Sequence, residues 1–155
     1  MSEVEKLTKF TKVRLDWFQS DDGEKRGGER RAALARLRLG VGKEAGTVPE
    51  TWKYIYEGFP DELAGKGDAP SYAENAIHAA LTLYAMHAQG KGNPRVHDGN
   101  AGSIGMALNN LKRKNLENEQ GILRRFNALV TAKTADEINL HARGVIQLLK
   151  QGEIK

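Results

Sequence analysis

Apolar residues recur every three or four positions along nearly the whole chain, and the alternation typical of β-strands is not sustained anywhere. This spacing puts apolar side chains on one face of a helix, so it predicts an all-α protein. We expect a single helical domain over residues 1–155, a compact bundle of about seven helices. The expected helices cover residues about 3–18, about 29–39, a short stretch after Pro49, about 70–89, a short stretch after Ser103, about 117–131, and a last stretch after Thr134.

Helix starts and breaks are marked by short local signals. The segments 47–50, 71–74 and 134–137 each place Ser or Thr three residues before Glu. This is the capping-box pattern, in which the two side chains satisfy the first backbone N–H groups of a helix. Asp21-Asp22-Gly23 and Gly27-Gly28 are both expected to break the chain before the second helix, and the glycine-rich segment 90–102 is expected to form a mobile loop.

The helix at about 70–89 is expected to lie at the centre of the bundle. It contains one charged residue, Glu74, and is apolar on several sides. The first and last helices are amphipathic instead, and the second helix is expected to end at Gly40. Predicted inward positions are Val4, Leu7, Thr11 and Phe18 in the first helix, and Leu34, Leu37 and Val41 in and just after the second. In the later helices they are Ile104, Ala107, Leu108 and Leu111 after Ser103, Ile122, Phe126 and Leu129 at about 117–131, and Ile138, Ala142, Val145 and Leu149 in the last.

Charge is segregated along the chain. Overall, 24 Lys and Arg face 20 Asp and Glu, for a net charge of +4. Residues 23–43 carry seven bases and two acids, residues 44–75 carry two bases and seven acids, and residues 112–133 return to a net +4. Such blocks predict basic and acidic surfaces on different sides of the molecule. The alternative is that each block is simply a solvated helix face.

Several classes of chemistry are absent from the sequence. There is no cysteine, which excludes disulfides, thiolate metal sites and cysteine nucleophiles. His78 and His87 are nine residues apart and do not share a helix face as metal ligands do, so we expect no metal site and no cofactor. No paired-carboxylate or Ser-His-acid pattern is present, and we expect a non-enzymatic protein. A polar N-terminus without a long apolar stretch favours a cytoplasmic location.

Basic helix faces suit contact with nucleic-acid backbone. Arg31 and Arg38 are seven residues apart and project almost in line beside the apolar stripe of the second helix, whereas Arg36 points away from it. Arginine holds phosphates through charge-assisted hydrogen bonds and counterion release, without reading bases. Two alternatives remain open at this point, a helical protein–protein interaction module and a helix-turn-helix DNA-binding regulator.

Several strings resemble the CasB family, the small subunit of the type I-E CRISPR Cascade surveillance complex. They occur in the order found in that family over residues about 30–150, which makes the combination more specific than any one string. The strings are RAALARLR at 31–38 with GTVPE at 46–50, HAALTLYA at 78–85, SIGMAL at 103–108, RRFNAL at 124–129 and ADE at 135–137.

The resemblance implies a non-catalytic all-α subunit that acts in antiviral defence. Its implied partners are the CRISPR guide RNA, the target and displaced DNA strands, the backbone and large subunits of Cascade, and a second copy of itself. Its implied role is to stabilise the guide RNA–target DNA hybrid and the displaced strand. The family usually continues beyond a segment like residues 151–155 into one or two more helices, so the resemblance also implies a chain that lacks these C-terminal helices.

Nine residues are candidates for nucleic-acid binding. The resemblance assigns such a role to Arg38, Arg124 and Lys133. Charge and helix geometry add six further residues, which are Arg31, Arg36, Lys112, Arg113, Arg125 and Arg143.

Overall fold

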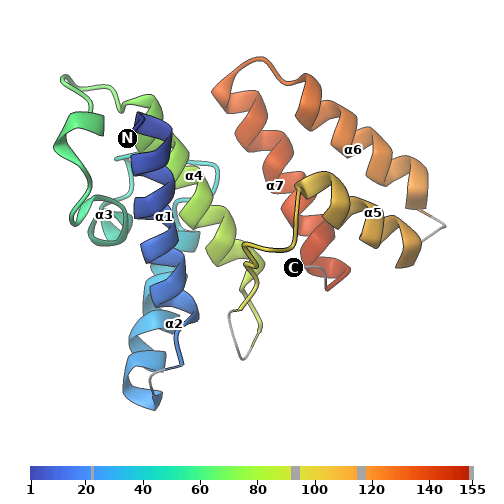
Figure 1. Ribbon diagram of the computed structural model, residues 1–155, viewed down its shortest axis with the longest axis horizontal. Helices are drawn as coiled ribbons and strands as arrows, with labels where there is room; N and C mark the ends of the chain where they lie inside the picture. Colours follow the sequence, from blue (N-terminus) through green and yellow to red (C-terminus); the bar gives the residue numbers. More distant parts are fainter. Residues whose placement is uncertain (22, 92–94, 115–117, 154–155) are drawn as a thin grey trace. The chain divides into compact units, whose positions relative to one another are not determined.

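The computed structural model describes residues 1–21, 23–91, 95–114 and 118–153. These residues form seven α-helices and one 3-10 turn, without any β-strand, which confirms the all-α prediction (Figure 1). The chain divides into two compact units, Met1–Arg95 and Val96–Lys155. The first unit contains α1 (Glu3–Gln19), α2 (Glu24–Arg38), α3 (Pro49–Tyr56), the 3-10 turn η1 (Asp61–Leu63) and α4 (Tyr72–His87), and the second contains α5 (Ile104–Lys114), α6 (Glu119–Thr131) and α7 (Ala135–Gln151).

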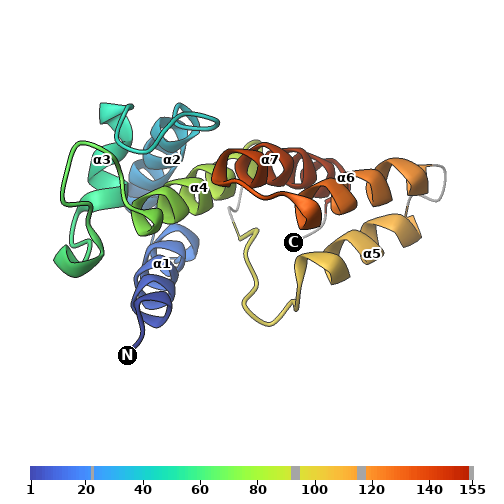
Figure 2. The ribbon, with the colours of Figure 1, turned by 90° about the horizontal axis from the view of Figure 1, so that it is seen from above.

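In the N-terminal unit, α4 packs against α1, α2 and α3. Figures 1 and 2 both show α4 beside α1. The Phe18 and Tyr84 rings lie 5.8 Å apart between these two helices. Removing such apolar side chains from water stabilises the unit. The other fully buried apolar side chains of this unit include Leu37, Ile55, Ile77 and Leu81. A central place for α4 in a bundle of all seven helices, and a single domain over residues 1–155, stay predictions.

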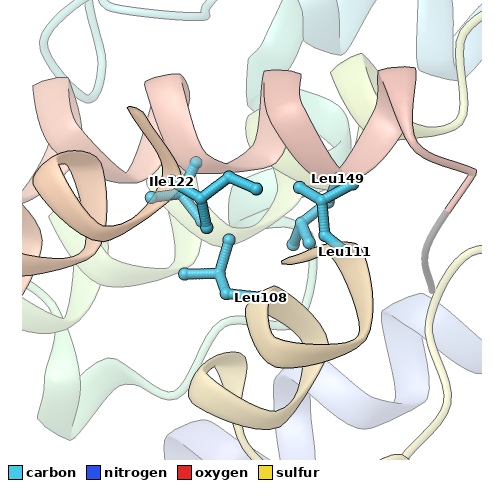
Figure 3. Packing of buried hydrophobic residues seen from close by; sticks show 5 residues of the cluster. Leu108, Leu111, Ile122 and Leu149 are labelled. Atoms are coloured by element: carbon cyan, nitrogen blue, oxygen red, sulfur yellow. The ribbon is translucent and has the colours of Figure 1, made fainter. Parts of the chain in front are cut away.

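The C-terminal unit has its own apolar core. The hairpin of α6 and α7 runs side by side in Figure 1, and α5 contacts both helices. In Figure 3, Leu108 and Leu111 of α5 point toward Ile122 of α6 and Leu149 of α7. Val145 completes this cluster and is fully buried. The buried side chains recur at three or four positions, which is why the helical period alone identified them.

Helix α2 begins earlier than its sequence predicts. It runs from Glu24 through Gly27 and Gly28, so the predicted break at these two glycines is wrong. Glycine lowers helix stability by about 1 kcal/mol relative to alanine but does not prevent a helix that tertiary contacts support. The Arg31 guanidinium lies 3.5 Å from where a Cβ of Gly27 would stand. The earlier of the two predicted breaks is confirmed at Gly23, which has a φ of 102° and serves as the N-cap.

Two of the three predicted capping boxes are confirmed. Ser71 and Glu74 form one at the start of α4, and Thr134 and Glu137 form another at the start of α7. The box predicted at 47–50 is wrong, because Val48 is the N-cap of α3 and makes no side-chain cap bond. The Thr47 hydroxyl instead donates to the main-chain oxygen of Glu44 at 2.7 Å. The Thr47 hydroxyl is thus used in a turn before α3 and does not cap the helix.

Three residues expected to face inward are exposed. Val4 is 73% exposed, Ile138 is 46% exposed and Ile104 is 39% exposed. Each lies in the first turn of its helix, α1, α7 or α5, whereas buried residues such as Phe18, Val145 and Leu108 lie further along. An apolar stripe is buried only where another element covers it, and the sequence period does not show where that cover begins. Residues 92–94 of the predicted loop and residue 117 of the predicted sixth helix lie outside the described residues.

The Glu137 carboxylate is expected to make the stability of α7 sensitive to acid. Hydrogen bonds from the backbone N–H groups of Lys133 and Thr134 lower the pKa of Glu137 below its ordinary value of 4.5. Its stabilising effect is therefore present above the unfolded-state pKa and is lost as the pH falls through the folded-state pKa. In Glu137→Gln the amide oxygen still accepts these bonds but does not titrate. We expect the variant to lose less thermal stability than the wild type between pH 6 and pH 3, measured by circular dichroism. Equal losses in both proteins would contradict this role.

Candidate nucleic-acid interface

A basic hollow lies in the N-terminal unit, between the end of α1, the length of α2 and the end of α4. It has a volume of about 590 Å³. Four cationic side chains and one carboxylate are among its described lining residues. These are Arg30, Arg31, Arg38 and Lys91, with Asp21 as the acid. The structure therefore brings Arg31 and Arg38 together, as their seven-residue spacing predicts.

Two of these arginines are anchored to the protein. Arg30 is buried, with 5% of its surface exposed, and its Nη1 donates to the Ser20 hydroxyl at 2.9 Å. Arg38 is half-buried, and its Nη1 donates to the main-chain oxygen of Ala85 on α4 at 3.4 Å. Arg31 is exposed and passes over Gly27 and Gly28. The hollow thus combines the buried positive charge of Arg30 with the half-buried Arg38 and the exposed Arg31, whose guanidinium groups can reach phosphates.

Arg36 lies on a different face of α2. It is exposed, and its Nη1 donates to the Tyr54 hydroxyl of α3 at 2.9 Å. It lines a second hollow of about 540 Å³ among α1, α2 and α3, which Arg31 and Arg38 do not line. The structure therefore separates Arg36 from the other two candidates of the second helix, in agreement with its predicted outward direction.

Five of the six candidate side chains in the C-terminal unit are exposed, and one of the six is paired. Lys112 at the end of α5 forms an ion pair with Glu119 of α6 at 2.5 Å. Arg125 of α6 reaches across to α7, because its Nη1 lies 2.6 Å from where a Cβ of Gly144 would stand. Arg143 of α7 directly precedes that glycine. The exposed candidates are Arg113, Arg124, Arg125, Lys133 and Arg143.

A second set of basic side chains, separate from that of the basic hollow, lies on the hairpin of α6 and α7. Residues 96–155 contain nine Lys and Arg and six Asp and Glu, so this unit carries a net +3. Arg124 lies on the outer face of α6, two residues after buried Ile122, whereas Arg125 flanks the apolar face and is carried toward α7. Arg125 and Arg143 therefore lie at neighbouring positions of the hairpin, although they are distant in the sequence.

Arg30 and Lys91 were not among the candidate residues. Arg30 belongs to the basic block at 23–43, and its burial would be hard to foresee because arginine is seldom buried. Lys91 directly follows Gly90, whose φ is 79°, and both residues line the basic hollow. The signal available in the sequence was a glycine just past a predicted helix end, followed by a base.

Two further features to consider in the described residues are a metal-binding group and a membrane-spanning helix. No group of three or more His, Asp and Glu side chains suited to a metal ion occurs among them. Across the same part of the chain, every helix is too short or too polar to cross a membrane.

The family comparison covers most of the chain. The family model of the CRISPR-associated protein Cse2 matches residues 33–155, which include eight of the nine candidate residues and leave out Arg31. No curated protein and no solved structure matches the chain. The matched residues run from the middle of α2 through α7 and so take in most of both units. The chain belongs to the CRISPR-associated protein Cse2 family, the small subunit of the type I-E Cascade complex.

Proposed function

We propose that this Cascade subunit binds the sugar-phosphate backbone of nucleic acid without reading its sequence. In this proposal it acts in the cytoplasm, has no catalytic activity of its own, and stabilises the guide RNA–target DNA hybrid and the displaced DNA strand during antiviral defence. The observation that carries the proposal is the basic hollow, where Arg31 and Arg38 are joined by Arg30 and Lys91. Family membership supplies the complex in which this surface works.

The spacing within the hollow suits an extended strand. Arg31 and Arg38 are two helical turns apart on α2, which is about 10 Å along the helix axis. Two cations at that separation contact different phosphates of one strand rather than the same phosphate. Neither side chain requires a particular base, because phosphate contacts position a nucleic acid without specifying its sequence. This suits a subunit that must work on every target.

Backbone contacts of this kind are enough to matter for the opening of a target duplex. The RNA–DNA hybrid that forms is about as stable as the DNA duplex that it replaces. Protein contacts of modest strength therefore shift the balance toward the open state. The exposed cations of the α6–α7 hairpin, Arg124, Arg125, Lys133 and Arg143, are proposed to give a second set of such contacts.

Replacing Arg31 and Arg38 together tests this proposal. We expect Arg31→Ala/Arg38→Ala to bind a single-stranded oligonucleotide more weakly than the wild type. Because each lost phosphate contact on a single strand removes about 0.7 from the slope of log K against log salt, the slope should become shallower by about 1.4. Fluorescence anisotropy of a labelled oligonucleotide, titrated at salt concentrations of about 50–300 mM, measures both the affinity and the slope.

A matched control removes two charges elsewhere. Lys12→Ala/Lys66→Ala has the same net charge as the double arginine variant, but both lysines are exposed outside the basic hollow. We expect its salt slope to stay close to that of the wild type. If the arginine variant keeps the affinity and slope of the control, the backbone-binding proposal is wrong. If it instead fails to assemble with the other Cascade subunits, the surface is a protein–protein interface.

A further inference from the structure

The second hollow of the N-terminal unit differs in chemistry from the basic hollow. We name it the aromatic hollow; it lies among α1, α2 and α3 and has a volume of about 540 Å³, within the range of small-ligand sites. Its walls carry the aromatic rings of Trp17 and Tyr54 and the cationic side chains of Arg36 and Lys53. The carboxylates of Glu29 and Glu57 line it as well. Charge is therefore mixed here, whereas the basic hollow is dominated by cations.

The Trp17 ring contacts a buried aromatic ring and is also partly exposed to solvent. Its ring packs edge-on against Phe18 with centroids 4.9 Å apart, and Phe18 is 1% exposed. Trp17 itself is 36% exposed. An aromatic side chain of this kind, backed by the core and open to solvent, provides a surface on which another flat ring can stack.

The polar groups of the aromatic hollow are partly fixed. Arg36 is held by its hydrogen bond to the Tyr54 hydroxyl at 2.9 Å, and Lys53 is exposed. The Arg14 guanidinium, which also lines the hollow, donates to the main-chain oxygen of Glu57 and lies over the Phe10 ring. Arg36 and Lys53 are thus the cations placed to meet an incoming phosphate. The two carboxylates can accept hydrogen bonds from N–H groups.

This combination matches an unpaired nucleobase with its flanking phosphates. A base is flat and aromatic, and it is uncharged but carries N–H donors that a carboxylate can accept. Unpaired strands are recognised by stacking of bases on aromatic side chains beside a positively charged groove. A double-stranded nucleic acid does not offer a free base, so the aromatic hollow selects single strands.

We propose that the aromatic hollow takes one nucleobase of a single DNA strand, stacked on Trp17, with Arg36 and Lys53 at the adjacent phosphates. This inference rests on the proposed function, since it assumes that the subunit binds a single strand. It adds a contact to the base that does not depend on base identity, because every base has a π face.

The chain contains two tryptophans, which allows a direct optical test. Trp52 is outside the aromatic hollow, where its indole N–H donates to the main-chain oxygen of Gly46 at 3.0 Å. In Trp52→Phe the fluorescence reports Trp17 alone. This variant is titrated with a 15-mer of thymidylate and with an abasic 15-mer that has the same phosphates but no bases. We expect the thymidylate 15-mer to quench the Trp17 fluorescence and the abasic 15-mer to quench it little. The abasic strand should bind at least about fivefold more weakly than thymidylate.

Substitutions of the two tryptophans complete the test. Trp17→Leu keeps an apolar side chain against Phe18 but lacks the stacking ring, and its fold is checked by thermal melting. We expect it to bind thymidylate about as weakly as the wild type binds the abasic strand, while Trp52→Leu binds like the wild type. Equal binding of both oligonucleotides with an unchanged salt slope would overturn the base site alone. Failure of both oligonucleotides to bind would overturn the proposed function as well.

Discussion

Truncation of Leu37 to alanine is expected to lower the free energy of unfolding by about 2–5 kcal/mol, the largest effect of any single substitution considered for this chain. Leu37 is completely buried on α2. Its removal forfeits the transfer free energy of the lost methyl groups and leaves a cavity that the surrounding helices fill only in part. Since α2 packs on both α3 and α4, a cavity on its buried face is expected to weaken the core of the N-terminal unit.

Leu39 provides the matched control for this prediction. It lies two residues further on and is 55% exposed, so Leu39→Ala is expected to change the unfolding free energy by about 0.5 kcal/mol or less. Urea denaturation followed by circular dichroism compares the two variants with the wild type. Similar destabilisation by both substitutions would show that the α2 face assigned to the core is wrong. Below its unfolding transition, Leu37→Ala should still bind an oligonucleotide, because no cation of the basic hollow is altered.

The helical pattern was predictable because each apolar stripe is a local property of the sequence. Thr134 and Glu137, or Ser71 and Glu74, fix a helix start within four residues, and the structure has both capping boxes. The same logic failed at Gly27 and Gly28. Glycine marks a weak helix from local propensity alone, but α2 is supported by contacts with α3 and α4 that come later in the chain.

The candidate site was predictable only where it depends on one helix. Arg31 and Arg38 share a face because seven residues make two turns, and the structure brings both to the basic hollow. The ion pair of Lys112 with Glu119 joins α5 to α6. The spacing of residues along one helix does not predict a contact between two helices. The approach of Arg125 to Gly144 depends on the register of the α6–α7 hairpin, which also lies beyond a local pattern.

Gly40 shows the same distinction between a local signal and its tertiary cause. The sequence predicted that the second helix stops at this glycine, and the structure agrees, with Leu39 as the C-cap and Gly40 as the next residue. Its φ is outside the left-handed region, so backbone freedom is not the reason for a glycine here. A Cβ at Gly40 would stand 2.9 Å from His78 Cε1 and 3.0 Å from Thr82 Cγ2. The turn after α2 thus needs glycine because α4 approaches it closely.

Gly40→Ala is therefore expected to destabilise the N-terminal unit by about 1–3 kcal/mol through overpacking. The added methyl group pushes on buried His78, whose Nε2 lies 2.9 Å from the Gly40 main-chain oxygen, and so strains this hydrogen bond as well. Gly28→Ala is the control, because it is expected to raise the free energy of unfolding instead of lowering it. It lies within α2, where a Cβ would meet only the Arg31 guanidinium at 4.0 Å, so we expect a gain of about 0.5–1 kcal/mol.

Thr82→Ser separates overpacking at Gly40 from any other cause. The serine lacks the Cγ2 methyl group that would stand 3.0 Å from the new Cβ, so adding Thr82→Ser to Gly40→Ala should restore part of the lost stability. Thr82→Ser alone should destabilise slightly, because it removes a buried methyl group. Urea denaturation of both single variants and the double variant gives the coupling free energy between the two positions. Purely additive losses would mean that close contact with α4 is not why the chain has glycine at position 40.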